Sequence, residues 1–222
     1  MLKKCYFENE NNIYEIGTDE AGRGPLFGRV YASAVILPNN QNFKYELMKD
    51  SKKFTSDKKL EYTAEYIKKN AIKWAVSYCD ENEIDKYNIR KATHIAMHKA
   101  IHNVINELSN NELSNELNYF ILVDGNDFTE MTILNNGTLN TIDYICIKGG
   151  DNLYSSIAAA SILAKYERDK YIYELCNTYP ELHEKYYLKN NKGYGTKKHI
   201  EGIIKHGISK YHRKTFGICK NY

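Results

Sequence analysis

The sequence has no long hydrophobic run and no closely spaced cysteines, and both absences exclude classes of protein. No stretch of about 18 consecutive apolar residues occurs in the 222-residue chain, so a transmembrane helix is not expected. The first five residues lack the apolar core of a secretory signal. The five cysteines are far apart without a C-x-x-C pair, which predicts neither a zinc site nor a disulfide framework. We therefore expect a reduced, cytoplasmic protein.

The charge balance is also modest. A formal net charge of +3 makes the chain mildly basic, which permits nucleic-acid binding without establishing it. The length fits one large domain with a small helical appendage. No heptad-like apolar stripe indicates oligomerisation, so a monomer is predicted.

The pattern of apolar residues predicts an α/β protein. Strands are expected over 13–16, 30–37, 72–78, 119–124 and 145–147, and helices over 56–70, 88–108, 155–176, 182–187 and 196–206. An imperfect polar repeat over 110–118 predicts a surface insertion.

Acidic residues follow three of the predicted strands. Asp19 and Glu20 follow the first strand, Asp124 ends the fourth, and Asp151 comes after the fifth. In α/β proteins, acids at strand ends can converge on one edge of the sheet. Carboxylate oxygens are suitable ligands for Mg²⁺ or Mn²⁺. The sequence therefore predicts a four-carboxylate cluster, although any one of these acids could simply form a turn.

Two glycines flank an arginine immediately after the first pair of acids. Gly22 and Gly24 allow the main chain on either side of Arg23 to approach a ligand closely, which suggests a ligand that carries phosphate or sugar. A tight turn between strands would need the same residues. A dinucleotide-binding fingerprint is disfavoured because Gly28 gives the wrong spacing and a strand, not a helix, follows.

The motifs taken together resemble the ribonuclease HII family, the type 2 ribonucleases H, along nearly the full chain. The matching segments are Asp19-Glu20-Ala21-Gly22-Arg23-Gly24-Pro25-Leu26, Asp50-Ser51-Lys52-Lys53, Val123-Asp124-Gly125, Ser156 to Lys165, Gly193-Tyr194-Gly195-Thr196 and Tyr211 to Phe216. Their order and spacing also match, which no single short motif offers. The resemblance implies a ribonuclease H-like fold with a central five-stranded mixed sheet flanked by helices. It places the catalytic domain at residues 1–178 and a C-terminal helical extension, packed on the same domain, at 179–222.

The resemblance also implies a reaction. The family hydrolyses the RNA strand of RNA/DNA hybrids and cuts on the 5′ side of ribonucleotides embedded in duplex DNA, leaving 3′-hydroxyl and 5′-phosphate ends. It implies that Asp19, Glu20, Asp124 and Asp151 are the catalytic carboxylates and hold two Mg²⁺ or Mn²⁺ ions. Two such ions can orient a water on one side of a phosphodiester and stabilise the leaving oxygen on the other. Whether a replication clamp recruits the protein stays open.

Substrate-binding residues follow from the same resemblance. Gly22, Arg23 and Gly24 resemble the loop whose main chain contacts the 2′-hydroxyl, a group that only RNA offers. Tyr194 corresponds to an aromatic ring that packs on the deoxyribose after the ribonucleotide and so selects an RNA-to-DNA junction. Candidate phosphate contacts are Ser51, Lys52, Lys53, Ser161 and Lys165, although lysines more often only solvate a surface.

Some positions depart from the family or lack a clear role. Phe27 and Arg29 stand where small or proline residues are usual, and Gly149 replaces a lysine. For Arg168 and Arg213, ion pairing within the fold is the expected role. Two other classes of function are also considered: a non-catalytic binder of hybrid duplexes, and a ribonuclease H-like nuclease of DNA junctions. Four clustered acids argue against the binder because they would repel phosphate.

Overall fold

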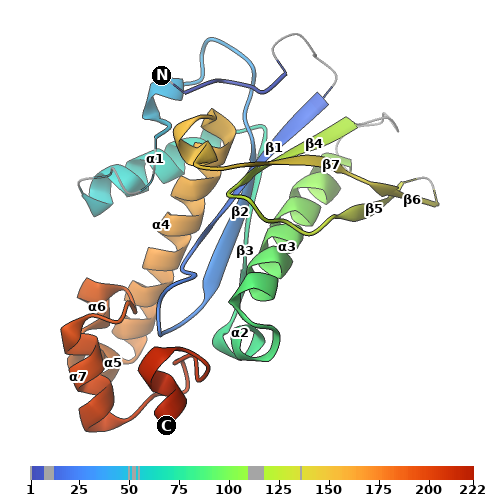
Figure 1. Cartoon of the computed structure of the whole chain (residues 1–222). Coiled ribbons are helices and arrows are strands. Elements are labelled where there is room, and N and C mark those ends of the chain that lie inside the picture. Colours follow the sequence, from blue (N-terminus) through green and yellow to red (C-terminus); the bar gives the residue numbers. More distant parts are fainter. Residues whose placement is uncertain are drawn as a thin grey trace.

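The computed structural model describes residues 2–7, 13–49, 51, 54, 56–109, 118–135 and 137–222 (Figure 1). The strands are β1 (Ile13–Ala21), β2 (Val30–Ile36), β3 (Lys73–Cys79), β4 (Asn118–Asp124), β5 (Thr132–Asn135), β6 (Thr138–Thr141) and β7 (Asp143–Ile147). The α-helices are α1 (Asp57–Asn70), α2 (Glu81–Tyr87), α3 (Ile89–Ser109), α4 (Ser155–Thr178), α5 (Pro180–Tyr186), α6 (Leu188–Asn191) and α7 (Lys197–His206). Short 3-10 helices are η1 (Tyr45–Leu47), η3 (Gly150–Asn152) and η4 (Gly217–Asn221). The polar repeat over 110–117 lies outside the described residues.

Five strands form the central sheet in the order β3-β2-β1-β4-β7. β2 runs antiparallel to β1 and β3, whereas β4 runs parallel to β1 and β7. The expected five-stranded mixed sheet is therefore confirmed. Thr18 of β1 pairs with Val123 of β4, so the next residues along the two strands, Asp19 and Asp124, reach the same edge of the sheet.

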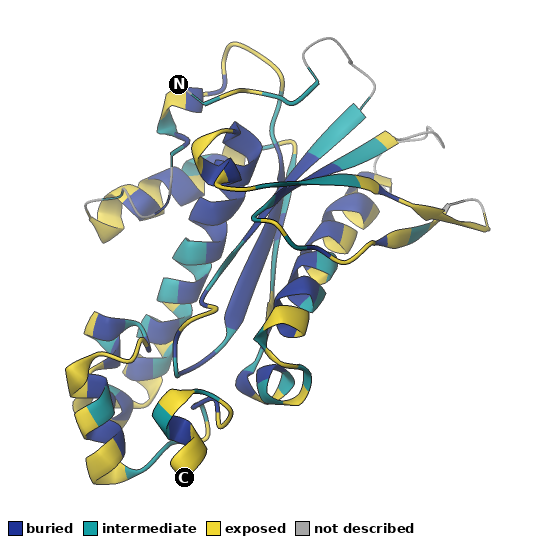
Figure 2. Cartoon of the chain, in the orientation of Figure 1, coloured by how far each residue is buried: buried dark blue, intermediate teal, exposed yellow. Residues whose placement is uncertain are grey.

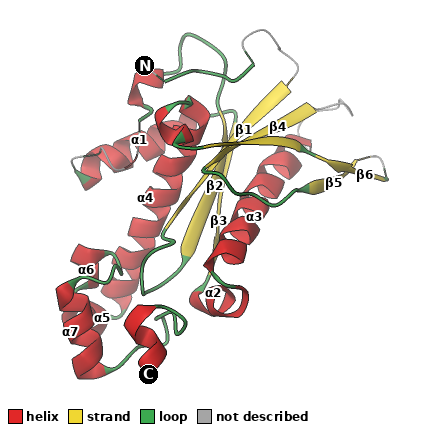
Figure 3. Cartoon of the chain, in the orientation of Figure 1, coloured by secondary structure: helices red, strands yellow, loops and turns green. Residues whose placement is uncertain are grey.

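Helices cover both faces of this sheet (Figures 1 and 3). α3 packs across β1, β2 and β3 on one face, while α4 packs on β1 and β2 on the other, with α1 beside it. Buried side chains concentrate at these two interfaces (Figure 2). β1 approaches α4 so closely that a Cβ atom on Gly17 would lie 2.3 Å from the carbonyl carbon of Ser156. Only glycine fits at this position, and the contact sets the distance between α4 and β1.

Apart from the short 3-10 helices, four elements of the structure were absent from the sequence prediction: β5, β6, α2 and α6. β5 and β6 form a separate two-stranded hairpin that was not expected, because its residues are largely polar and exposed. α2 was also missed, although its start carries a capping box: Asp80 accepts the N–H of Glu83, and the Glu83 side chain accepts the N–H of Asp80. The other predicted helices and strands are present, with ends shifted by a few residues.

The C-terminal helices pack on the far half of α4. Ile172 and Cys176 of α4 share a buried cluster with Leu182, Tyr186 and Ile203 from α5 and α7. The chain then returns so that residues 209–216 lie beside the connection between β1 and β2 (Figure 1). The domain boundary at 178/179 coincides with the end of α4 and stays a prediction. None of the helices in the described part of the chain has the length and apolar character needed to cross a membrane.

Candidate active site

The sequence had placed Asp19 and Glu20 after the first strand, but in the structure both residues lie inside β1. β1 continues to Ala21, since its pairing with β2 extends to Tyr31. The Asp19 side chain is 5% exposed and its Oδ1 accepts the N–H of Glu20 at 2.7 Å. The sheet therefore holds the two acids on a rigid element at the edge that faces the connection to β2.

Three of the predicted carboxylates lie close enough to repel one another. Burial raises the pKa of Asp19 well above its usual range, and the charges of Glu20 and Asp124 raise it further. The pKa of Glu20 is also raised by burial, with Asp124 adding to the effect and Arg23 opposing it. A hydrogen bond from Ser161 partly stabilises ionised Asp19. A cation at this place would relieve the repulsion.

Asp124 connects the pair to the fourth predicted acid. Its Oδ1 accepts the N–H of Gly150 at 2.6 Å and lies 3.4 Å from the N–H of Asp151. Asp151 is 7% exposed and lies in η3, one turn beyond the end of β7 and not directly at a strand end. Its Oδ1 accepts a hydrogen bond from the Asn152 amide at 2.9 Å. The structure thus brings all four acids to one edge of the sheet.

The donor set suits a hard divalent cation. All four candidate ligands are carboxylates, which Mg²⁺ and Mn²⁺ prefer and which make a zinc site improbable on ligand type. Within the described ranges, no three acidic, histidine or cysteine side chains are arranged closely enough to hold one ion. Backbone and amide donors engage Asp124 and Asp151 instead. The residues fit the ion by ligand chemistry and by the repulsion that an ion would remove.

The glycine-rich loop lies directly beside these acids. Gly22 has φ of +94°, a conformation that favours glycine. A Cβ atom on Gly24 would lie 3.5 Å from the Tyr194 ring, so the structure brings together two features 170 positions apart in sequence. Tyr194 is 48% exposed, and Arg23 reaches back to Glu20 at 3.4 Å. A sugar bound against this loop would therefore contact both bare backbone and an aromatic ring.

The predicted phosphate contacts have other partners in the fold. Ser51 and Ser161 are buried, and their hydroxyl oxygens lie 3.0 Å apart behind Asp19. Lys165 forms an ion pair with Asp169 at 2.9 Å. Lys52 and Lys53 lie outside the described residues. A role for any of them in phosphate binding stays a prediction.

Arg213 was expected to form an ion pair, and that expectation is wrong. Among the described residues it has no carboxylate within ion-pair distance. Its guanidinium is fully buried and donates to four carbonyl oxygens of the loop 22–28. Arg168 lies nearby, 3.9 Å from Asp169, and donates to the Lys192 carbonyl at 2.8 Å. Residue type gave no signal for these partners, because they are backbone atoms far away in sequence.

Comparisons with known proteins show the family of the chain. The sequence profile described as Ribonuclease HII matches residues 16–219. A Ribonuclease HII from Parabacteroides distasonis is 44% identical over 207 residues, which cover 93% of this chain and 92% of that protein. The chain belongs to the ribonuclease HII family. A Ribonuclease HII from Rickettsia akari is 43% identical and covers 96% of this chain and 97% of its own. Membership makes the protein a metal-dependent hydrolase of the type 2 ribonuclease H class.

Solved structures share the fold. Ribonuclease HII from Archaeoglobus fulgidus, solved in a complex with PCNA, has a TM-score of 0.65 at 21% identity and covers 92% of this chain and 96% of that one. Ribonuclease H2 from Pyrococcus horikoshii has a TM-score of 0.62 at 22% identity, covering 93% of this chain and 95% of that one. Bst-RNase HIII in complex with Mn²⁺ has a TM-score of 0.59 at 20% identity and covers 75% of this chain and 55% of its own. These likenesses show the ribonuclease H-like fold.

One departure from the family pattern has a structural explanation. Phe27 is fully buried, and its ring packs edge-on against His212 at 5.0 Å between centroids. Residue 27 also forms a single antiparallel bridge with residue 212. In this ribonuclease HII the aromatic side chain thus fastens the glycine-rich loop to the C-terminal segment.

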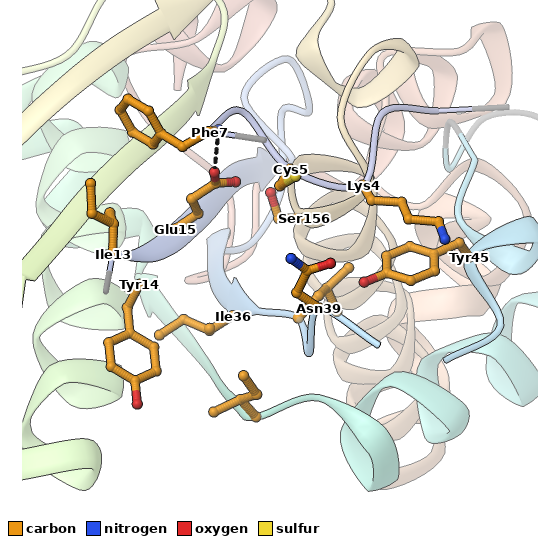
Figure 4. A pocket seen from close by; sticks show the side chains of 12 residues that line it. Lys4, Cys5, Phe7, Ile13, Tyr14, Glu15, Ile36, Asn39, Tyr45 and Ser156 are labelled. Atoms are coloured by element: carbon orange, nitrogen blue, oxygen red, sulfur yellow. Dashed lines mark hydrogen bonds between the residues drawn. The ribbon is translucent and has the colours of Figure 1, made fainter. Parts of the chain in front are cut away.

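A cavity lies at the opposite end of β1, and an acid on its wall has a structural role (Figure 4). Glu15 lies on its wall, and its carboxylate accepts the N–H groups of Tyr6 and Phe7 at 2.7 to 2.9 Å. Burial raises the pKa of Glu15, and these backbone hydrogen bonds oppose the rise. This acid therefore anchors the N-terminal segment and is separate from the catalytic edge.

Proposed function

We propose that the protein hydrolyses the RNA strand of RNA/DNA hybrids and cuts on the 5′ side of ribonucleotides embedded in duplex DNA. The products carry 3′-hydroxyl and 5′-phosphate ends. The observation that carries this proposal is the position of the Gly22–Gly24 loop, which lies between the acids of β1 and the exposed ring of Tyr194. A sugar held by this loop would have its phosphate next to the carboxylates.

Each part of the site has a role in the proposal. Asp19, Glu20, Asp124 and Asp151 would hold Mg²⁺ or Mn²⁺, and bound ions supply the charge that activates a water and stabilises the leaving oxygen. The main chain of the loop binds the 2′-hydroxyl, which distinguishes RNA from DNA. Tyr194 packs on the next sugar and excludes a second 2′-hydroxyl there.

Phosphate contacts from the two strands of the duplex complete the site. We assign them to Ser51, Lys52, Lys53, Ser161 and Lys165. Lys165 would have to exchange its ion pair with Asp169 for a phosphate oxygen. The Lys165 side chain is about one-third exposed and could swing toward the solvent, whereas Asp169 is mostly buried and would keep Arg168 3.9 Å away as a cationic neighbour.

Cleavage of four end-labelled substrates tests the proposal. They are a DNA duplex with one ribonucleotide, an RNA/DNA hybrid, an all-DNA duplex and a DNA junction, each with Mg²⁺, Mn²⁺ or a chelator. We expect metal-dependent cutting of the first two, with the first cut on the 5′ side of the ribonucleotide. Cleavage of the junction would instead favour a junction nuclease, and tight metal-independent binding without cleavage would favour a binder.

Matched variants separate the site from the fold. Asp19→Asn and Asp124→Asn should nearly abolish turnover while the far-ultraviolet circular dichroism stays unchanged. Asp143→Asn provides a control, because Asp143 is an exposed acid on the neighbouring strand β7. Wild-type rates in the first two variants would refute the assigned carboxylates.

Partners and location are part of the same proposal. A sliding clamp is a candidate partner because the Archaeoglobus relative was solved in complex with PCNA. We further propose a cytoplasmic monomer. Size-exclusion chromatography with and without a purified clamp checks both the oligomeric state and the interaction.

A further inference from the structure

Arg213 uses every nitrogen of its guanidinium to hold one loop. Nε donates to the Gly28 carbonyl at 2.8 Å, Nη1 to the Pro25 and Arg23 carbonyls at 2.8 and 3.0 Å, and Nη2 to the Gly22 carbonyl at 2.6 Å. The acceptors lie 185 to 191 positions away in sequence. All four belong to the connection between β1 and β2. The guanidinium therefore fixes the path of the loop from its first residue to its last.

This arrangement is costly for the fold. Arg213 is fully buried, and burial together with the nearby charge of Arg168 lowers its pKa to about 9. A buried cation without a directly bonded carboxylate is normally unfavourable. Here the four carbonyl oxygens and the face of Phe216, 5.0 Å away, compensate it, and the more distant charges of Asp85 and Glu81 contribute as well. An apolar side chain could fill this space without the desolvation cost. The hydrogen bonds to the loop are what an apolar residue could not supply.

The direction of these carbonyls determines where the loop amides point. The loop peptides are trans, and in a planar trans peptide the C=O and N–H groups point in opposite directions. The Gly22 and Arg23 carbonyls point inward to Arg213, so the N–H groups of Arg23 and Gly24 point away from it. Leu26 confirms this geometry, because the Pro25 carbonyl binds Arg213 while the Leu26 N–H donates outward to Gly193 at 2.9 Å.

The outward N–H groups are free to bind a ligand. Across the described ranges, neither the Arg23 nor the Gly24 N–H donates to another residue. A Cβ atom on Gly24 would lie 3.5 Å from the Tyr194 ring, so the residue that carries the second of these amides lies beside the exposed aromatic residue. Two oriented donors thus face the place where the proposed function puts the ribose.

We propose that Arg213 is the positioning residue of the ribose-reading loop: by turning the loop carbonyls inward, it presents the Arg23 and Gly24 amides to the 2′-hydroxyl. This inference rests on the proposed function of the loop. Arg213 does not touch the substrate. It acts through the backbone, so the selectivity for a 2′-hydroxyl depends on it.

The test compares the binding of two fluorescent DNA duplexes that differ by a single 2′-hydroxyl. Ca²⁺ replaces the catalytic ion so that binding is measured without turnover. The readout is the ratio of the two Kd values, all-DNA over ribonucleotide-containing. A variant with a lower folded fraction changes both apparent Kd values by the same factor and leaves this ratio unchanged. A purely structural role would therefore not alter it.

Arg213→Lys is the central variant, because lysine keeps the charge but loses the planar fork that reaches four carbonyls. We expect its Kd ratio to fall by about tenfold or more, the effect of losing one well-oriented hydrogen bond. Arg29→Lys is the matched control. Arg29 lies over the rings of Tyr78 and Tyr171, and its hydrogen bond goes to Tyr31. Its ratio should equal that of the wild type.

The outcomes distinguish a failure of the role of Arg213 from a failure of ribose reading itself. A folded Arg213→Lys variant with the wild-type ratio overturns the inference and leaves the proposed function intact. If thermal melting shows that this variant does not fold, Phe216→Leu loosens the seat of the same guanidinium and should lower the ratio in the same direction. An unchanged ratio there overturns the inference. A wild-type ratio near one refutes ribose reading itself, and the inference with it.

Discussion

Two buried histidines predict a loss of stability in acid. His199 Nδ1 lies 2.9 Å from the Tyr194 carbonyl, the two Nε2 atoms of His199 and His212 lie 3.1 Å apart, and His212 Nδ1 lies 2.9 Å from the Ser209 N–H. Because a carbonyl only accepts and an N–H only donates, these partners assign one proton to each ring. His212 then donates to His199 through Nε2. The neutral pair satisfies all four ring nitrogens. An additional proton would break the hydrogen bond between the rings or the one from the Ser209 N–H, and among the described groups the Ser209 hydroxyl, 2.9 Å from His212 Nδ1, is placed to accept it.

The expected size of the effect follows from the pKa values. Burial, followed by the neighbouring His199, lowers the pKa of His212 to about 3, and burial lowers that of His199 as well. In the unfolded chain both rings have a pKa of about 6.5. Since the folded pKa is the lower one, the stability is complete above about pH 6.5 and is lost as the pH falls toward 3. At about pH 4.5, which lies about two pH units below the unfolded pKa, the contribution of His212 to the free energy of unfolding is reduced by about 3 kcal/mol.

Urea unfolding at about pH 7.5, 5.5 and 4.5 measures this loss. We expect His212→Gln to be less stable than the wild type at about pH 7.5 by about 1–3 kcal/mol, because the Ser209 N–H and His199 Nε2 lose their partner. The same variant should lose about 2–3 kcal/mol less than the wild type on acidification. His206→Gln replaces an exposed ring and serves as the control. If wild type and His212→Gln show equal pH dependence, the assignment of a neutral buried pair is wrong.

Three further predictions concern the catalytic edge. Asp19→Asn should raise the apo protein's melting temperature by a few degrees, because it removes a buried charge that raises the free energy of the fold, and should abolish stabilisation by Mn²⁺ in the same melting assay. Gly17→Ala should lower the free energy of unfolding in urea by about 3 kcal/mol or more, since its Cβ would meet the α4 backbone at 2.3 Å. Gly125→Ala, with φ of +102° and open space around the new Cβ, should lower it by only about 1 kcal/mol. Tyr194→Ala should weaken the preference for deoxyribose after the ribonucleotide in a cleavage assay with matched substrates, and Tyr194→Phe should retain it because the stacking face is kept.

The sequence predicted that the acids would meet at one edge of the sheet, because the signal for a strand that ends in an acid is local. An apolar run followed by an acid is visible within ten residues, and parallel pairing of β1 with β4 then places Asp19 and Asp124 together. The secondary-structure element that carries each acid was harder to predict. β1 extends through Asp19 and Glu20 because β2 pairs with it up to Ala21, and this pairing depends on residues that follow the loop. Asp151 lies in a 3-10 turn because Gly149 adopts a positive φ of 67°.

The parts that the sequence did not predict depend on long-range contacts with the main chain. The partners of Arg213 are carbonyl groups, which every residue carries, so neither residue type nor spacing identifies them. His199 and His212 likewise have no metal-ligand spacing, and their pairing appears only when α7 packs beside the C-terminal segment. By contrast, α2 could have been found, because the Asp80 to Glu83 capping box is a local signal.

The loop 22–28 lies between a group of acids and a pair of arginines. Its carbonyl groups and its amide groups therefore face different surroundings. Acids of β1 and β4 lie on one side, where burial and mutual repulsion raise the pKa of Asp19. Arg213 and Arg168 lie on the other side, where burial and the charge of Arg168 lower the pKa of Arg213. The loop carbonyls face the arginines, so the amide N–H groups face outward, with their positive ends toward the position proposed for the ribose and its phosphate. The repulsion among the acids would be offset by divalent ions, whereas four loop carbonyls already offset the buried charge of Arg213. The outward amides would find their acceptors in an oxygen-rich nucleic acid. A site built in this way should therefore be more stable with metal and substrate bound than free, by the linkage between binding and folding.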